Sequence, residues 1–522
     1  MADKERKILL QIANLKQYFP VGGRKNLFVK ANDGISIDIY EGEAFGLVGE
    51  SGCGKSTLGR SILQLYKQTD GRTMYFGRSI DELAPKYAYD TFRTLTKRRE
   101  LMKERQAKYE EFKKEYDSKP ENEKYELHSK MVQLRKEAND AMLDVTTLIG
   151  GLVLYPDLSQ VEALFTEIYR LGKEQSAAVD KRELAQLDVD DTAYALKKAQ
   201  EAGKPTDALK AKLDKYKTKL KEIDDHIEAL KKQTADTYKK SEVFRKEVEK
   251  MPDYEKYEEH HSDGIDLARL TYNEMRKLRS DMQLIFQDPY SSLNPRMTVG
   301  QIIGEGMLAH NYFRKNDERM QEEVIRVMEE CGLAPYFLHR YPHQFSGGQR
   351  QRIGIARSLA LRPKFVVCDE AVSALDVSIQ AQIINLLQDL KEKQHLTYLF
   401  ITHDLSVVKF ISDRIGVMYL GNMVETADSE ELFAHPLHPY TEALINAIPT
   451  TDPDADKKPE VLEGDIPSPV NPPKGCKFHT RCKYCTEICT KVAPEWEEVR
   501  PNHFVACHHL LEQTDQNNKG QA

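Results

Sequence analysis

The sequence predicts an α/β protein with a core of parallel strands that is interrupted by a long helical insert. Three observations support this prediction. A short apolar run at 44–48 leads into a glycine-rich loop and then into a helical stretch. A second apolar run, at 365–368, ends in two acids, Asp369 and Glu370. Between these elements lies a segment rich in Lys, Glu, Asp, Gln and Tyr, whose apolar residues recur at helical spacing.

Length and composition limit the class of protein. A chain of 522 residues is long enough for about two to four domains. Its net charge of -7 argues against a nucleic-acid-binding protein whose affinity comes from a dominant basic surface. No apolar run reaches the roughly 18 residues that a membrane-spanning helix requires, and the N-terminus lacks the apolar stretch of a secretory signal. We therefore expect a cytosolic protein that acts at a membrane only through partners.

Changes in residue content divide the chain into four regions. Residues 1–87 and 269–430 alternate apolar stretches with glycine-rich turns, and we expect them to form the two parts of the core. Residues 88–268 form the predicted helical insert, and residues 431–522 are rich in Pro, His and Cys. A core tolerates such an insertion because the entropy of closing a loop grows only logarithmically with loop length.

Apolar residues in the insert predict several helices. The clearest stripe alternates spacings of four and three, as in the seam of a coiled coil. Breaks at Pro120, Gly150–Gly151 and Gly203–Pro205 separate the helices. We expect antiparallel helices packed as a coiled-coil hairpin or a small bundle; solvated, partly frayed helices are the alternative. The stripe comprises Leu209, Leu213, Tyr216, Leu220, Ile223, Ile227 and Leu230.

The glycine-rich loop after the first apolar run matches the pattern GxxxxGK[ST]. Its glycines allow backbone N–H groups to point inward at phosphates, with the N-terminus of a helix behind them. Lys55 can then reach the β- and γ-phosphates of a nucleotide, and the hydroxyl of Ser56 can bind Mg²⁺. The predicted ATP-binding residues of this loop are Gly49, Glu50, Ser51, Gly52, Cys53, Gly54, Lys55, Ser56 and Thr57.

The two acids that end the second apolar run suit the chemistry of the phosphate loop. An acid at the end of a parallel strand beside such a loop can hold Mg²⁺, directly or through water, and we assign this role to Asp369. The adjacent Glu370 can polarise the attacking water as a general base. An ordinary solvated acid pair is the alternative, which the presence of Lys55 disfavours.

A second glycine-rich segment lies between the loop and the acids. Ser346, Gly347, Gly348 and Gln349 stand at the start of a predicted helix, where backbone N–H groups can bind phosphate. The chain already has one phosphate loop and no second lysine loop. We therefore expect this second phosphate-binding segment to bind the nucleotide of a partner subunit. The alternative is that Ser346 only caps a helix.

This set of motifs resembles the ATPases of ABC transporters, whose signature is matched by SGGQ followed by a helix, ahead of an Asp-Glu strand. The resemblance implies a mixed sheet with RecA-like and helical subdomains and an antiparallel β subdomain. It also implies two subunits that sandwich two nucleotides head to tail. Gln287 matches the glutamine loop that senses Mg²⁺, and His403 matches the histidine that contacts the γ-phosphate. The loop that crosses the dimer interface is matched by Ser373, Ala374, Leu375 and Asp376.

The same family stacks an aromatic side chain on the adenine base from an N-terminal strand and loop. Tyr18, Phe19 and Phe28 all fall in the matching stretch. We favour Phe19, and any of the three could instead belong to the core.

The C-terminal region resembles one branch of this family. HPLHPYT at 435–441 and IPSPVNPPKGCKFHTRC at 466–482 resemble the import ATPases for oligopeptides and dipeptides. The resemblance implies an enzyme that uses ATP and Mg²⁺ to power peptide uptake, as a peripheral subunit at the cytoplasmic face of the cell membrane. It implies as partners a related ATPase subunit in a heterodimer, two transmembrane permeases and an extracytoplasmic peptide-binding protein, and no nucleic acid.

Five cysteines crowd into the last fifty residues, which in a reducing compartment indicates metal or iron–sulfur ligation rather than disulfides. The resemblance implies a 4Fe–4S cluster held by four of them. Zinc and free thiols are the alternatives, and Cys485 is extra to the family pattern, which leaves the choice of ligands open. The four matched residues are Cys476, Cys482, Cys489 and Cys507.

A chromosome-maintenance ATPase of the SMC type is the alternative from another class, since such proteins also interrupt an ABC core with a coiled coil. Their coiled coil enters after the glutamine loop, whereas Gln287 follows the insert here. The cysteine-containing tail would have no role in them. A translation factor with twin cassettes does not fit either, because the chain has one phosphate loop. We therefore expect a transport ATPase.

Overall fold

The computed structural model describes the chain except for residues 1–5, 23–26, 374, 449–461, 463 and 512–522. Its centre is an eight-stranded sheet with the strand order β11-β12-β10-β9-β3-β8-β7-β6. The strands from β9 to β6 are parallel, and β10, β12 and β11 extend the sheet by antiparallel pairing. The bounds are β3 Ala44–Val48, β6 Met282–Ile285, β7 Phe365–Asp369, β8 Thr397–Ile401, β9 Arg414–Tyr419, β10 Asn422–Asp428, β11 Glu497–Arg500 and β12 His503–Val505.

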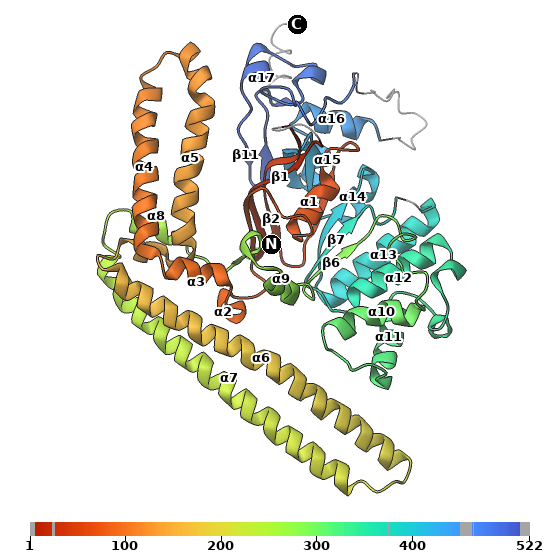
Figure 1. Cartoon of the computed structure of the whole chain (residues 1–522). Helices are drawn as coiled ribbons and strands as arrows, with labels where there is room; N and C mark the ends of the chain where they lie inside the picture. Colours follow the sequence, from red (N-terminus) through yellow and green to blue (C-terminus); the bar gives the residue numbers. More distant parts are fainter. Residues whose placement is uncertain (1–5, 23–26, 374, 449–461, 463, 512–522) are drawn as a thin grey trace.

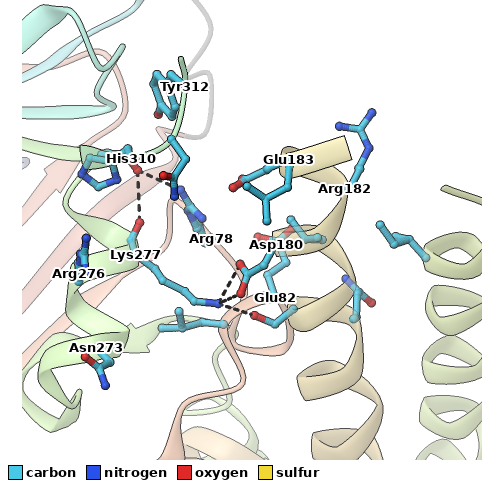
Figure 2. A pocket seen from close by; sticks show the side chains of 18 of the residues that line it. Arg78, Glu82, Asp180, Arg182, Glu183, Asn273, Arg276, Lys277, His310 and Tyr312 are labelled. Atoms are coloured by element: carbon cyan, nitrogen blue, oxygen red, sulfur yellow. Dashed lines mark hydrogen bonds and ion pairs between the residues drawn. The ribbon is translucent and has the colours of Figure 1, made fainter. Parts of the chain in front are cut away.

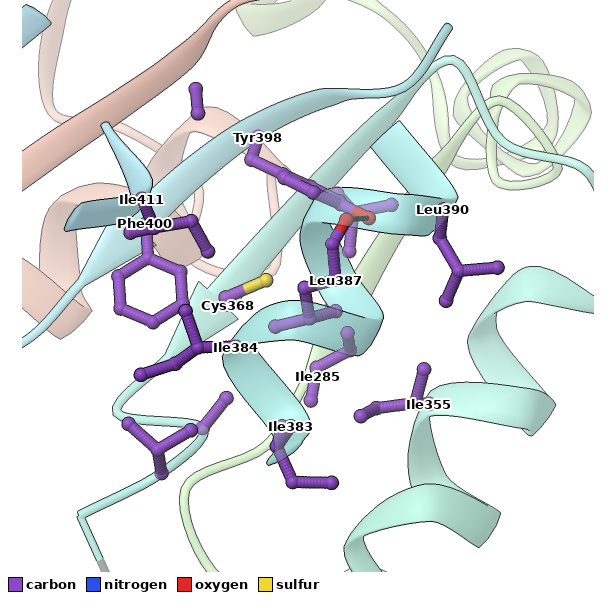
Figure 3. Close-up of a cluster of buried hydrophobic side chains, with 14 of the residues drawn as sticks. Ile285, Ile355, Cys368, Ile383, Ile384, Leu387, Leu390, Tyr398, Phe400 and Ile411 are labelled. Atoms are coloured by element: carbon purple, nitrogen blue, oxygen red, sulfur yellow. Dashed lines mark hydrogen bonds between the residues drawn. The ribbon is translucent and has the colours of Figure 1, made fainter. Parts of the chain in front are cut away.

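The central strands are short apolar runs because helices cover both faces of the sheet. Every residue of β3, β7 and β8 is buried. Figure 3 shows one of the two interfaces, in which Leu387 and its neighbours on helix α13 pack over Cys368 and Phe400 of the sheet. The helices of the core are α1 Lys55–Ile62, α9 Tyr272–Leu278, α10 Val299–Ala309, α11 Glu318–Glu330, α12 Gly347–Leu359, α13 Val377–Gln394 and α14 Leu405–Ile411.

A second sheet of four antiparallel strands, ordered β2-β1-β4-β5, packs beside the first. The expected mixed sheet and antiparallel sheet are thus both present. The pairing of β4 with β5 explains how the insert is accommodated, because Tyr75 of β4 lies opposite Ile265 of β5. The chain therefore leaves the core and returns to it on adjacent strands. The bounds are β1 Ile8–Pro20, β2 Phe28–Tyr40, β4 Asp70–Tyr75 and β5 Ile265–Asp266.

Between β4 and β5 the chain forms two long helical hairpins that project in different directions (Figure 1). The first pairs α4 with α5, and the second pairs α6 with α7. Helix α6 has 44 residues and is therefore roughly 65 Å long at about 1.5 Å per residue. Leu213, Ile227 and Leu230 of α7 are buried, whereas other members of its apolar stripe stay partly exposed. The bounds are α2 Ile80–Leu83, α3 Lys86–Phe92, α4 Leu95–Asp117, α5 Glu121–Ile149, α6 Leu158–Glu201, α7 Asp207–Val248 and α8 Tyr254–Glu258.

Ion pairs fix the second hairpin to the core. Lys277 of α9 lies 2.9 Å from Asp180 of α6, and Arg314 lies 3.0 Å from Asp191 of the same helix. Arg319 of α11 also pairs with Asp191. Helix α6 therefore contacts two parts of the core, next to α9 and next to α11.

The C-terminal region is continuous with the core sheet. Strand β12 pairs with β10, so that Val505 lies opposite Glu425, and β11 then pairs with β12. Phe478 belongs to the main hydrophobic core. The helices of this region are α15 Ser429–Ala434, α16 Pro439–Asn446 and α17 Glu487–Lys491. Within the described part of the chain, no helix combines the length and apolar content needed to span a bilayer.

Candidate functional site

The phosphate loop connects β3 to α1, as its sequence predicts. Gly54 caps α1 with a φ of 104°, a conformation that favours glycine. A Cβ atom at Gly54 would lie 2.1 Å from the carbonyl oxygen of Ala31 on β2. The loop thus passes close to the second sheet, where only a glycine fits.

Lys55 lies inside this loop and is 5% exposed. Its Nζ donates hydrogen bonds to the carbonyl oxygens of Gly49, at 2.7 Å, and Glu50, at 3.0 Å. The backbone carbonyl groups of the loop therefore hold the ammonium group of Lys55 within the loop. A cation in this position can neutralise phosphate oxygens that the surrounding N–H groups bind.

Asp369 ends β7 beside the start of α1. The hydroxyl of Ser56 donates a hydrogen bond to its Oδ1 at 2.5 Å, and Arg60 lies 3.1 Å from its Oδ2. A hydroxyl and a fully buried carboxylate are the oxygen ligands that Mg²⁺ prefers, so these two residues fit the expected metal. The sequence analysis did not identify Arg60; its place one turn after Ser56 on α1 is the signal that could have found it.

Glu370 is the point at which three predicted catalytic residues meet. Nε2 of Gln287 donates a hydrogen bond to Oε2 of Glu370, and Nδ1 of His403 lies 3.4 Å from Oε1. Gln287 follows β6, Glu370 follows β7 and His403 follows β8, which are adjacent parallel strands. Glu370 has a φ of 48°, an unfavourable conformation for a residue other than glycine and one that clusters at functional sites.

A cavity of about 390 Å³ opens beside the phosphate loop. Its lining includes Lys55, Ser56, Gln287 and Glu370, so these four predicted residues surround one space, whereas Asp369 and His403 are not among its lining residues. Several other lining residues were not predicted for the site, because they come from separate parts of the chain and, apart from Pro469 in the tail motif at 466–482, belong to no motif. These are Val29, Lys30, Ala31, Leu420, Gly421 and Pro469.

The three candidate aromatic residues for adenine occupy different positions. Phe19 lines the cavity and packs edge-on against Tyr66 with 5.3 Å between ring centroids. The hydroxyl of Tyr18 donates instead to Asp33, and burial raises the pKa of this tyrosine. Phe28 is 42% exposed and is not among the residues that line the cavity. The structure therefore places only Phe19 of these three where a base could lie.

The signature segment does not reach the phosphate loop of its own chain. Ser346 caps α12, and its Oγ accepts a hydrogen bond from the backbone N–H of Gln349. Ser346 and Gly347 are exposed, while Gly348 is buried against Ile379 of α13. None of the four signature residues lines the cavity beside Lys55.

The predicted dimer-interface loop leads from Glu370 into α13. The hydroxyl of Ser373 donates to the carbonyl oxygen of Glu370 at 3.1 Å. Asp376 caps α13 by accepting a hydrogen bond from the backbone N–H of Ile379, and hydrogen bonds lower the pKa of this exposed carboxyl. Leu375 packs near Gly347, and Ala374 lies outside the described residues.

The tail cysteines lie near one another in the C-terminal region. The backbone N–H of Cys476 donates to the carbonyl oxygen of Cys489 at 2.8 Å. Burial raises the pKa of Cys476 to about 11 and that of Cys507 to about 12, and the neighbouring thiols add to both shifts. Cys482 is partly buried and Cys485 is exposed. Among the residues that the structure describes, no three His, Cys, Asp or Glu side chains are grouped to hold a metal ion.

A larger cavity, of about 960 Å³, lies between the α6–α7 hairpin and the core. Figure 2 shows Asp180 and Glu183 of α6 facing Lys277 and Arg78 across it. Lys277 is paired with Asp180, and Arg78 is paired with Asp281. No residue predicted for the ATP site lines this cavity. Because the cationic groups of Lys277 and Arg78 are already paired with carboxylates, we do not regard this cavity as a nucleotide site.

Comparison with known proteins relates parts of the core and of the tail to a single group of proteins. The family model described as "ABC transporter" matches residues 32–152 and 252–373. The model described as "Oligopeptide/dipeptide transporter, C-terminal region" matches residues 424–489. The first match includes the α4–α5 hairpin, and neither match covers the α6–α7 hairpin.

Curated relatives agree with these matches. The oligopeptide transport ATP-binding protein AppF of Bacillus subtilis is 54% identical over 47% of this chain and 75% of its own length. A putative peptide import ATP-binding protein of Brucella ovis is 55% identical over 47% of this chain and 77% of its own. The oligopeptide transport ATP-binding protein OppF of Salmonella typhimurium is 52% identical over 47% and 73%. The resemblance noted in the sequence is confirmed.

Proposed function

This chain belongs to the ATP-binding proteins of oligopeptide ABC transporters, and we propose that its residues Lys55, Asp369 and Glu370 carry the ATP hydrolysis that powers peptide import. The observation that supports this assignment is the meeting of Gln287 and His403 on the carboxylate of Glu370, at the edge of the cavity that Lys55 also lines. Three adjacent parallel strands bring these side chains together.

Each residue has a defined part in the proposed reaction. The N–H groups of the phosphate loop and the ammonium of Lys55 bind the β- and γ-phosphates. Ser56, Asp369 and Gln287 would hold Mg²⁺, which neutralises charge on the phosphate oxygens when it is bound. Glu370 accepts a proton from the attacking water and orients it. His403 donates a hydrogen bond to the γ-phosphate, and Phe19 stacks on the adenine.

We propose that the hydrolytic site is completed by a second, homologous ATPase subunit. The signature residues Ser346, Gly347, Gly348 and Gln349 form a helix N-terminus that can bind phosphate, and they do not line the cavity of their own chain. In a head-to-tail pair this segment would close over the nucleotide of the partner. The loop Ser373–Asp376 would cross the interface, and a heterodimer is the proposed form.

The membrane assembly follows from the same proposal. Two transmembrane permease subunits would dock on this ATPase pair at the cytoplasmic face of the membrane. An extracytoplasmic binding protein would deliver the peptide to them. We further propose residues 88–268 as an inserted coiled-coil-like domain between the two core segments, 1–87 and 269–430. An SMC-type role is not favoured, because the insert joins β4 to β5, ahead of Gln287.

For the tail, residues 431–522, we propose a 4Fe–4S cluster with a structural role, held by Cys476, Cys482, Cys489 and Cys507. Its support is that the thiols of Cys482 and Cys489 lie close enough to add to the raised pKa of Cys476, and that these three thiols add to the raised pKa of Cys507. Thiolates bind iron–sulfur clusters and zinc, so zinc and free thiols are outcomes of the same test. Ligation would require the thiols to ionise and regroup.

Reconstitution tests the proposed function. The full chain is assembled with its permeases and partner ATPase in vesicles, and peptide uptake and phosphate release are measured with and without ATP. We expect both to depend on ATP and to disappear with Lys55→Ala. Uptake that continues without ATP, or with Lys55→Ala at the wild-type rate, would contradict the proposal.

A further inference from the structure

The C-terminal tail contacts the phosphate loop through a buried ion pair. The guanidinium of Arg481 donates two hydrogen bonds to the carboxylate of Glu50, at 2.7 and 3.1 Å. The side chain of Arg481 is 4% exposed and that of Glu50 is 23% exposed. A two-point contact between guanidinium and carboxylate fixes the orientation of both groups as well as their distance.

The backbone of Glu50 is held by the tail as well. Its N–H donates a hydrogen bond to the hydroxyl oxygen of Tyr440 at 2.9 Å. Tyr440 is fully buried and packs against Tyr419 and Phe478 with ring centroids 4.8 and 5.3 Å apart. Because these rings are fixed in the core, the hydroxyl of Tyr440 has little freedom to follow the loop.

The tail also touches the cavity beside the loop. Pro469 lines that cavity, and its carbonyl oxygen accepts a hydrogen bond from the N–H of Lys30 at 3.2 Å. Lys477 donates to the carbonyl oxygen of Leu420 at 3.1 Å, and Leu420 is another lining residue. The tail therefore contributes one lining residue of this cavity and forms hydrogen bonds to two others.

A direct chain of contacts leads from Arg481 to the phosphate-binding lysine. Arg481 holds the side chain of Glu50, and the carbonyl oxygen of Glu50 is one of the two that hold the ammonium of Lys55. Moving Glu50 would therefore move an anchor of Lys55. An ion pair with this little exposure resists separation, because each charge would be left buried without its partner.

We propose that Arg481 is a positioning residue for ATP hydrolysis, acting through Glu50 to fix the phosphate loop and Lys55. The inference rests on the proposed ATP hydrolysis at this loop, and it assigns the tail a role in the catalytic cycle beyond its own folding. The ATP site then depends on a segment that lies more than four hundred residues from it in the sequence.

Two features of the chain make the test selective. Trp496 is the only tryptophan in the sequence; it lies in the tail and stacks on Phe504 at 6.0 Å, so its fluorescence reports the fold of the tail. Arg500 provides a control, because it forms an ion pair within the tail, with Glu431 of α15, and neither residue lines the cavity. Arg500→Ala therefore removes a comparable tail contact away from the loop.

The experiment measures kcat and KM for ATP in the assembled transporter with Arg481→Ala, Arg481→Lys, Glu50→Gln and the double variant Arg481→Ala/Glu50→Gln. We expect Arg481→Ala to lower kcat/KM by about tenfold or more with unchanged Trp496 emission, a size typical of a lost charge-assisted contact of about 1.4 kcal/mol. Arg481→Lys should recover part of the activity. The double variant should be no worse than either single change, since both remove one interaction. Arg500→Ala should stay near the wild-type rate.

The kinetics and the Trp496 emission of these variants also define the results that would contradict the proposal. Wild-type kinetics in Glu50→Gln and Arg481→Ala, with the tail folded, would show that the ion pair does not position the loop. Equal losses in Arg481→Ala and Arg500→Ala, each with altered Trp496 emission, would show a structural role only. If Arg481→Ala alone unfolds the tail, a normal rate in Glu50→Gln rejects the proposal and a reduced rate supports it. Absence of ATP hydrolysis by the wild-type assembly would instead reject the proposed function itself.

Discussion

Gln287 donates a hydrogen bond to the carboxylate of Glu370, although 83 residues separate the two. The contact arises because β6 and β7 are adjacent parallel strands, so residues that follow them meet at the same edge of the sheet. It holds one oxygen of Glu370, while His403 approaches the other. The proposed general base is therefore positioned by one polar side chain at each of its carboxylate oxygens.

Replacing the proposed general base should separate binding from chemistry. We expect Glu370→Gln to retain ATP binding and to lower turnover by roughly 100-fold or more, because proton abstraction by a side chain contributes about 10²–10⁴-fold. Phosphate release and binding of a fluorescent ATP analogue measure the two properties. Glu392→Gln, at an exposed position on α13, is the matched control. Normal hydrolysis by the Glu370 variant in the assembled transporter would refute the assignment.

Replacing the proposed metal ligand should change the Mg²⁺ requirement. Asp369 accepts hydrogen bonds from Ser56 and Arg60, and an amide in its place keeps the shape but loses the charge. We expect Asp369→Asn to raise the Mg²⁺ concentration for half-maximal hydrolysis by roughly tenfold or more. A titration of ATPase rate against Mg²⁺ measures this, with Asp389→Asn on the exposed face of α13 as the control. An unchanged titration curve would remove Asp369 from the metal site.

Blocking the signature segment should affect turnover but not nucleotide binding. Ser346 is exposed and lies away from the phosphate loop of its own chain. We therefore expect Ser346→Arg to leave binding of a fluorescent ATP analogue unchanged in the isolated chain and to reduce hydrolysis at the composite site in the assembled pair. Single-turnover measurements with a mixed pair, in which one member is Ser346→Arg, locate the loss. A loss confined to the altered chain's own nucleotide would contradict the composite site.

The buried carboxyl of Asp81 should make the stability of the insert depend on pH. Burial raises its pKa to about 6, above its usual value of about 3.9 in an unfolded chain. Between these values the folded state keeps a proton that the unfolded state has lost, so stability falls as pH rises through this window and stays lower above it. The loss amounts to at most about 3 kcal/mol, at about 1.4 kcal/mol per pKa unit.

The variant Asp81→Asn should remove this dependence and keep the hydrogen bond from Tyr238. We expect it to match the wild type near pH 4 and to be more stable near pH 7. Thermal unfolding followed by circular dichroism measures the difference at each pH, and Glu82→Gln, the exposed neighbour, is the control. A constant difference between pH 4 and 7 would contradict the expectation.

The proposed cluster in the tail can be tested without measuring ATPase activity. If a 4Fe–4S cluster is present, the full chain purified without oxygen should contain iron and sulfide and absorb visible light. Cys482→Ser should then lose the colour. Exposed Cys485 provides the matched variant, Cys485→Ser, which we expect to keep it. A colourless protein that contains zinc, or no metal, would reject the cluster.

The sequence by itself determined the sites that are made of consecutive residues. The loop from Gly49 to Thr57 could be recognised because one continuous segment supplies its N–H groups, its lysine and its hydroxyl. The roles of Gln287 and His403 were expected from the resemblance to ABC ATPases, whose motifs occur in this order along the chain. Periodic apolar residues likewise predicted the helices of the insert, because helical spacing is a local property.

Only the tertiary structure decided contacts that join distant segments. It placed Phe19 rather than Tyr18 or Phe28 in the cavity, and it joined β11 and β12 of the tail to the core sheet. It also brought Arg481 and Tyr440 to Glu50. No spacing in the sequence encodes such pairs, because their distance depends on the path of the whole chain between them. For that reason the phosphate loop could be recognised from its residues, whereas the contacts between the tail and this loop could not be predicted.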